Sequence, residues 1–391
     1  MKRLRISSEK FSLVMKAAGM TALAFVLSWL LTAPFSASTS AIFSSPEKTD
    51  FILSDFYAQV ADRRPVRNLS DRIVIIDIGR ANRDEIAALI GDVGLCAPDA
   101  VGVDVNFEEA RDDDSNLIAA LASVEKIVMP VSVKESEGED KFEIDDRPFF
   151  YGQLDNVKYG AVNLPGKFEG ATIREFTVGY PIKGGGEQAS FVTAIAEEVS
   201  PEKVNQLKER HHQYETIDYP SREIPEITIE EFYSRPESIE GKIVLIGALD
   251  EASDMHGTPV RSSMSGIKIH AHALSTVLDG SYYSSLPKWF DNAVAMMLCF
   301  FMILMSIGLT TKFKGIMIRI VQVILVYLAI RIGYSLYVDH RVIGDFSLTM
   351  LMIAFGTFAI DIWNGLEGLL TAVGKWIRKI KTKREKRLEV E

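Results

Sequence analysis

Four stretches of the chain are apolar for about 20 residues each, which is the length that an α-helix needs to cross a bilayer. They cover residues 11–33, 289–310, 316–338 and 345–363. Between the first and the second lie residues 34–287, in which short apolar runs alternate with polar segments as they do in a soluble domain. The pattern predicts a membrane protein with four transmembrane helices and one inserted globular domain, with short ends at residues 1–10 and 364–391.

Within the inserted domain, four apolar runs show no polar alternation, which is typical of strands buried on both faces of a parallel sheet. These runs are "DRIVIIDIG" (71–79), "DAVGVDVNF" (99–107), "KIVMPVSV" (126–133) and "GKIVLIGAL" (241–249). Helical patterns separate the first three runs, and that order requires parallel crossovers. We therefore expect an α/β domain with a mostly parallel sheet and helices on both faces. Residues 159–166 and 174–182 have the pattern of an antiparallel pair, with Gly170 in the turn.

Charge divides along the same boundaries. Residues 34–287 contain 24 Lys and Arg and 44 Asp and Glu, a net charge of −20, whereas the rest of the chain carries +10. The positive-inside rule places both basic termini in the cytoplasm and the acidic domain outside, in the periplasm if the chain lies in a bacterial inner membrane. The acidic domain would repel nucleic acid. A cleaved signal peptide in place of the first span stays an alternative, since "SASTSA" (36–41) offers small residues.

Polar residues follow the predicted strands. Asp77, Asp104 and Asn106 come at the carboxyl ends of the first two strands, which we expect to be neighbours in the sheet. Open α/β sheets bind ligands beyond these ends, so the three side chains are candidates for a ligand site. Asp254, beyond the fourth strand, is placed to join them. The alternative is that strand-end Asp residues only cap the loop or helix that follows.

Three histidines, His256, His270 and His272, lie within 17 residues and raise the question of a metal site. In a helix over residues 268–280 the last two are about 200° apart around the axis, so they cannot bind one ion. We expect His270 to be buried and His272 to be exposed. The sequence shows no catalytic constellation, no metal-binding motif and no cofactor-binding motif.

The order of these segments resembles the CHASE-type extracellular sensor domains, in particular their second subclass. The resemblance covers residues 50–285 and rests on "FYAQVADRRP", "IVIIDIG", "AVGVDVNFEE", "GAVNLPG", "GKIVLIGAL", "SDMHGTPV" and "GIKIHAHALSTVL". It implies the extracytoplasmic input domain of a receptor, with an unknown small-molecule or envelope ligand. Asp254 and His270 match the family's strand-and-helix motif, which favours a ligand-binding or architectural role for both.

The segment after the fourth span is short and basic, with no room for a kinase or a nucleotide cyclase. The resemblance therefore implies that a signal passes to a membrane or cytoplasmic protein partner in trans. We expect the eight basic residues of 375–387 to contact anionic membrane lipids, and a homo-oligomer stays open. Two rival functions also stay open. One is a periplasmic metal-dependent hydrolase that uses Asp77, Asp104 and Asp254, and the other is a purely structural envelope protein.

Four charged residues lie inside or at the ends of the predicted spans, where ionisable groups are costly and often functional. Arg319 and Asp361 fall near the cytoplasmic ends of the third and fourth spans and are predicted to pair. Arg331 lies deeper and is predicted to reach towards Asp291, at the outer end of the second span. Snorkelling to the headgroups is the alternative for both arginines.

Overall fold

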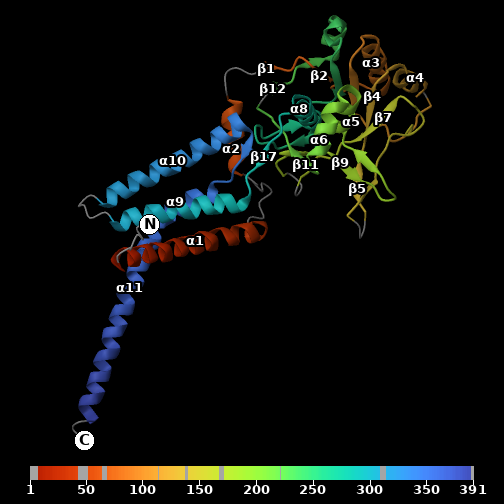
Figure 1. The fold of residues 1–391 in the computed structure, drawn as a ribbon. Helices are drawn as coiled ribbons and strands as arrows, with labels where there is room; N and C mark the ends of the chain where they lie inside the picture. The colour runs from red at the N-terminus through yellow and green to blue at the C-terminus, as the bar shows by residue number, and fades with distance from the viewer. Residues whose placement is uncertain are drawn as a thin grey trace, which may run out of the picture. The chain divides into compact units, whose positions relative to one another are not determined.

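The chain forms two compact units, residues 47–284 (the globular unit) and residues 1–46 with 285–391 (the helical unit). The computed structural model describes residues 8–42, 52–63, 68–112, 114–136, 140–166, 171–220, 222–308 and 314–388, and Figure 1 shows their helices and strands. Gly170, the predicted turn residue, lies outside the described residues.

The globular unit is built on a six-stranded sheet in which every neighbouring pair is parallel. Its order is β13-β2-β14-β3-β4-β7. The strands are β2 (Ile73–Asp77), β3 (Ala100–Val103), β4 (Ile127–Val131), β7 (Val157–Ala161), β13 (Glu226–Thr228) and β14 (Ile243–Gly247). The predicted α/β class with a mostly parallel sheet is confirmed.

Helices cover both faces of this sheet because successive strand residues point to opposite sides. Ile73, Ile75 and Leu245 pack in one core, against α5 (Phe191–Val199), α6 (Pro201–Glu209) and α8 (Gly266–Asp279). Val74 and Ile246 pack in the other core, whose helical residues come from α3 (Arg83–Leu95), α4 (Ser115–Ser123), α7 (Ile229–Ser234) and the 3-10 helix η1 (Pro236–Ile239).

Two expectations about the sheet are corrected. The first two predicted strands, β2 and β3, are not neighbours, because β14 lies between them and pairs with both. The expected antiparallel pair is also absent from the described residues. Instead β7 extends the main sheet beside β4, β8 (Glu175–Thr177) pairs with β11 (Tyr214–Thr216), and β9 (Gly179–Pro181) pairs with β10 (Glu187–Ala189). Pairing between distant segments decided both cases, and local pattern does not carry that information.

Short elements complete the chain. They are α2 (Leu53–Asp62), β1 (Asn68–Leu69), β5 (Val133–Glu135), β6 (Phe142–Ile144), β12 (Arg222–Glu223), the 3-10 helix η2 (Ala252–Asp254), β15 (Met255–His256), β16 (Met264–Ser265), β17 (Ser284–Ser285) and β18 (Val342–Ile343). Of these, α2 is held against the rest of the globular unit by a bidentate ion pair. Arg174 donates from Nε to Oδ1 of Asp55 at 2.8 Å and from Nη2 to Oδ2 at 2.7 Å.

The helical unit consists of α1 (Ser8–Ile42), α9 (Lys288–Gly308), α10 (Lys314–His340) and α11 (Ser347–Leu388). All four are long and apolar enough to cross a membrane, as predicted. Small residues let the helices approach closely. A Cβ added at Gly356 would lie 2.3 Å from Cε of Met302, and one added at Gly19 would lie 2.6 Å from the ring of Trp363.

Candidate functional site

Asp77 ends β2, and its carboxylate joins two loops at the carboxyl edge of the sheet. Its Oδ1 accepts hydrogen bonds from the backbone N–H groups of Gly79, at 3.0 Å, and Leu249, at 3.1 Å. Gly79 has a φ of +51°, a conformation that glycine adopts without strain. The first bond is the capping role of a strand-end Asp, and the second fixes the loop that follows β14.

Asp104 follows β3, across from the end of β14. A Cβ added at Gly247, the last residue of β14, would lie 3.3 Å from the Cβ of Asp104. Burial, followed by the negative charges of Asp254 and Glu251, raises the pKa of Asp104 to about 7. Near neutral pH this carboxyl group is therefore divided between its protonated and ionised forms.

Asp254 holds the start of α8. Its Oδ2 accepts a hydrogen bond from the backbone N–H of Gly266 at 2.8 Å, and its Oδ1 lies 3.2 Å from Nε2 of His256. A carboxylate is favourable at a helix N-terminus because it satisfies a free N–H and meets the positive end of the helix dipole. The absence of a side chain at Gly266 is what lets Asp254 come close, since an added Cβ would lie 2.5 Å from Oδ1.

His270 lies on the first turns of α8 with 5% of its surface exposed, and its ring packs against that of Phe191 with centroids 5.4 Å apart. Burial lowers the pKa of His270 to about 4, and the attraction of Asp254 offsets this only in part. His270 is therefore neutral at physiological pH. The structure thus brings three of the candidates, Asp104, Asp254 and His270, within electrostatic reach of one another.

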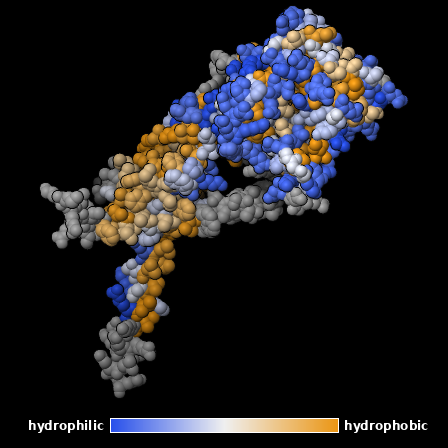
Figure 2. Space-filling view, turned by 45° about the vertical axis from the view of Figure 1, so that its right-hand side comes forward, coloured by the Kyte–Doolittle hydropathy of each residue, from blue (hydrophilic) through white to orange (hydrophobic). Residues whose placement is uncertain are grey.

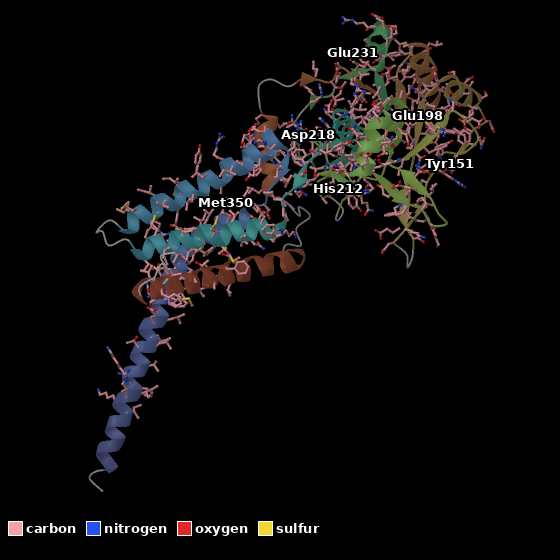
Figure 3. All side chains as sticks on the ribbon, in the orientation of Figure 1. Tyr151, Glu198, His212, Asp218, Glu231 and Met350 are labelled. Atoms are coloured by element: carbon pink, nitrogen blue, oxygen red, sulfur yellow. The ribbon has the colours of Figure 1, made fainter. Side chains whose placement is uncertain are left out.

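The expectation that His272 is exposed is wrong. It is as buried as His270, at 5% exposed, and its ring packs on Tyr219 with centroids 5.3 Å apart. The reason is that α8 is covered nearly all around, since its buried residues run from Gly266 to Leu278 with Lys268 the exception. His212, labelled in Figure 3, lies at the surface, with Nδ1 3.0 Å from Oε1 of Glu215.

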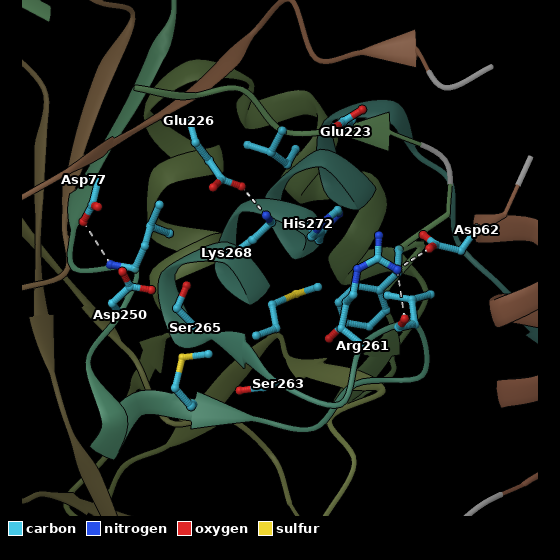
Figure 4. Close-up of a pocket in the computed structure, with 16 residues that line it drawn as sticks. Asp62, Asp77, Glu223, Glu226, Asp250, Arg261, Ser263, Ser265, Lys268 and His272 are labelled. Carbon is cyan, nitrogen blue, oxygen red and sulfur yellow. Dashed lines mark hydrogen bonds and ion pairs between the residues drawn. The ribbon is translucent and has the colours of Figure 1, made fainter. Parts of the chain in front are cut away.

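A cavity of about 400 Å³ lies at the carboxyl ends of β2 and β14 and shares the loop of residues 248–256 with the group just described (Figure 4). Asp77 is the one predicted candidate that lines it. Its charged lining comes from five carboxylates and two bases, Asp62, Asp77, Glu223, Glu226, Asp250, Arg261 and Lys268. Its apolar lining includes Met255, Val260 and Met264. The cavity therefore combines an apolar body with a surplus of negative charge.

Two ion pairs lie in the cavity wall, and neither of their bases was singled out by local sequence pattern. Arg261 Nη1 lies 2.6 Å from Oδ2 of Asp62, the last residue of α2. Lys268, on α8, pairs with Glu226 at the start of β13. Asp62 and Arg261 are 199 positions apart in sequence, so no spacing rule could have joined them.

The remaining candidates do not join this site. Asn106 is exposed and donates from Nδ2 to Oε1 of Glu108 at 2.7 Å. Among the described residues, no three His, Cys, Asp or Glu side chains are placed to share a metal ion. The hydrolase hypothesis needs Asp77, Asp104 and Asp254 around one ion, and the geometry gives it no such centre.

In the helical unit, neither predicted ion pair forms between the described side chains. Arg319 donates from Nη1 to Oε1 of Gln322, on the same helix, at 3.0 Å and to Oγ1 of Thr357, on α11, at 2.9 Å. Thr357 lies one helical turn before Asp361, which is exposed. Gln322 also donates to the carbonyl of Ile353 at 2.7 Å, so neutral polar groups join α10 to α11.

Asp291, the other predicted partner, is buried at 6% exposed and bonds within the loop before α11. Its Oδ2 accepts a hydrogen bond from the backbone N–H of Asp345 at 3.1 Å. Arg331 lies on an exposed face of α10. The structure therefore shows no ion pair between these two described side chains.

Comparison with families of known domains matches residues 29–309 to the CHASE2 domain. The matched segment contains the whole globular unit and α9, which is more than half of the chain. Comparisons with curated proteins and with solved structures gave no match.

Proposed function

The chain belongs to the CHASE2 domain family, and from that premise we propose that it is a membrane-held sensor that binds a signal in its globular unit and passes it to a separate protein. CHASE2 is a type of extracellular sensor domain, which supports a receptor-like role. We assign the sensing role to the strand-end cavity, because its position at the carboxyl edge of a parallel sheet is the usual place for a ligand in this class of fold.

The lining suggests the chemistry of the ligand. Five carboxylates face two bases, and both bases already have carboxylate partners. A small molecule with an apolar body and one or more positively charged or hydrogen-bond-donating groups would complement this lining. A small anion would have to displace a carboxylate from Arg261 or Lys268.

We infer that the signal passes from the cavity to the membrane spans along the chain. Asp62 ends α2, and Lys268 and His272 belong to α8, so three lining residues lie on helices that lead towards membrane spans. The end of α8 at Asp279 is separated from the start of α9 at Lys288 by eight residues. A ligand that moves α8 therefore has a short covalent path to the helical unit.

We propose a multi-pass location in a bacterial inner membrane, with the globular unit in the periplasm and both termini in the cytoplasm. The net charge of −20 over residues 34–287 and of +10 over the rest supports this orientation under the positive-inside rule.

The test is a thermal-shift screen of the full-length protein in lipid nanodiscs against a library of small amines and small carboxylic acids. Ser263 lines the cavity and Ser262 does not, although both are exposed. We expect amines to raise the Tm of the wild type and of Ser262→Trp but not of Ser263→Trp, whose indole would fill the cavity. Equal shifts in both variants would place binding elsewhere, and stabilisation by acids alone would overturn the proposed ligand chemistry.

A further inference from the structure

The last helix is longer than a membrane span requires. The apolar part of α11 covers Ser347–Ile380, 34 residues. At 1.5 Å per residue it is about 51 Å long, whereas a hydrocarbon core is about 30 Å thick and takes about 20 residues. Counting 20 residues from Ser347 reaches Leu366, so the rest of this apolar segment lies beyond a single crossing.

A charged cluster marks the level at which α11 leaves the hydrocarbon. Lys16 Nζ lies 2.6 Å from Oε2 of Glu367, and Trp363 donates from Nε1 to Oε1 of the same carboxylate at 2.8 Å. Ion pairs avoid the hydrocarbon core, and Trp is enriched at the membrane interface. Glu367 therefore lies at the membrane surface, in agreement with the count from Ser347.

Beyond this level α11 is amphipathic. Seven apolar side chains recur at spacings of three and four and are 43–70% exposed: Leu366, Leu369, Leu370, Val373, Trp376, Ile377 and Ile380. This spacing places all seven on one stripe of the helix. Lys375, Arg378 and Lys379 lie on the opposite side. In Figure 2 this part of α11 is hydrophobic along one side and hydrophilic along the other.

Charge decides what covers the stripe. In sequence, residues 368–388 contain eight Lys and Arg and one Glu. Two such segments side by side would repel each other, and the carboxylate beside the stripe, that of Glu367, is already paired with Lys16. An anionic lipid surface attracts the same charges and also accepts the apolar stripe, which matches the composition of helices that lie in a membrane interface.

We propose that residues 366–380 of α11, the interfacial segment, lie along the anionic leaflet at the level of Glu367, with the apolar stripe buried among the lipids. The turn from the span into the surface takes place at Gly365 and Gly368. An added Cβ at either glycine would meet nothing within 4 Å, so packing does not require glycine there. Glycine is the weakest helix former after proline, and two of them in one turn make this the weakest turn of the continuous helix α11, so the proposed bend is placed here.

The test uses the full-length protein with Cys96→Ser, reconstituted into vesicles of phosphatidylcholine with or without phosphatidylglycerol. A nitroxide label at Ile377→Cys reports on the stripe, and one at Lys379→Cys, on the opposite side of the same turn, is the matched control. In vesicles with phosphatidylglycerol we expect the first label to be relaxed more by oxygen than by a water-soluble nickel chelate, and the second to show the reverse. Lys375→Glu with Arg378→Glu should abolish the difference.

Three results would overturn the proposal. A label at Ile377→Cys that prefers the nickel chelate in both kinds of vesicle would show that the stripe lies in water. Spin–spin broadening at that position would show that a second copy of the chain covers it. Equal burial in both kinds of vesicle would show that lipid charge has no part. None of these results bears on the cavity, so this proposal and the proposed sensing role fail separately.

Discussion

Replacing Asp104 by Asn should change how the stability of the globular unit depends on pH. The pKa of Asp104 is raised from its usual 3.8 to about 7, first by burial and then by Asp254 and Glu251. Below pH 4 the carboxyl is protonated in both the folded and the unfolded chain, so it contributes no pH dependence. Between pH 4 and 7 the unfolded chain releases the proton while the folded chain keeps it, so the free energy of unfolding falls as pH rises.

The size of this effect follows from the shift. For each pH unit between pH 4 and pH 7, the free energy of unfolding of the wild type falls by about 1.4 kcal/mol, and most of this range lies above pH 5. Asp104 keeps part of its surface in water, which reduces the effect. We therefore expect the free energy of unfolding of Asp104→Asn, relative to that of the wild type, to rise by about 2 kcal/mol between pH 5 and pH 8. In a domain of this size, 1 kcal/mol corresponds to roughly 2–4 °C in Tm, which makes the expected gain roughly 4–8 °C.

The assay is thermal unfolding of the full-length protein in detergent, followed by near-ultraviolet circular dichroism at pH 5 and pH 8. Asp155→Asn, at an exposed turn, controls for the removal of one carboxylate from an acidic domain. Asp254→Asn should lower the pKa of Asp104 and so reduce the gain from Asp104→Asn. An advantage of Asp104→Asn that is the same at both pH values would refute the reasoning.

Three further experiments test other parts of the structure. Asp55→Asn leaves the guanidinium of Arg174, 16% exposed, without its carboxylate, and should lower the free energy of unfolding by about 3 kcal/mol in the same assay. A loss under 0.5 kcal/mol would mean that α2 is held by packing alone. His270→Ala and His272→Ala should each lower the free energy of unfolding by about 1–3 kcal/mol, because both rings are buried against aromatic neighbours. A His272→Ala variant as stable as the wild type would contradict the burial of His272. A thiol at Glu135→Cys should react with a membrane-impermeant reagent added from the periplasm, and a thiol at Lys381→Cys should react only after the inner membrane is opened. Labelling of both thiols from the same side would exclude the four-span topology.

The sequence allowed the class of fold to be predicted, because the strands of a doubly covered parallel sheet are continuous apolar runs. The runs that became β2, β3, β4 and β14 have that character. The edge strands β7 and β13 do not, since their sequences, VKYGA and EIT, mix polar with apolar residues. The insertion of β14 between β2 and β3 depends on contacts between distant segments, which no local pattern encodes.

The candidate site was accessible to prediction only in part. Strand-end position identified Asp77 and Asp104, because the carboxyl edge of a parallel sheet follows from topology alone. It could not show that Asp77 lines the cavity whereas Asp104 does not and instead lies within electrostatic reach of Asp254. Arg261 was missed because a single Arg in a loop carries no signal until Asp62, from the other end of the unit's chain, is found beside it.

The most direct test of the sensing role is native mass spectrometry of the intact protein, purified from its own membranes in a mild detergent. If the cavity binds the signal, the wild type and Ser262→Trp should carry a small molecule that dissociates on activation, and Ser263→Trp should not. The same bound mass in all three proteins would contradict a ligand site in the cavity.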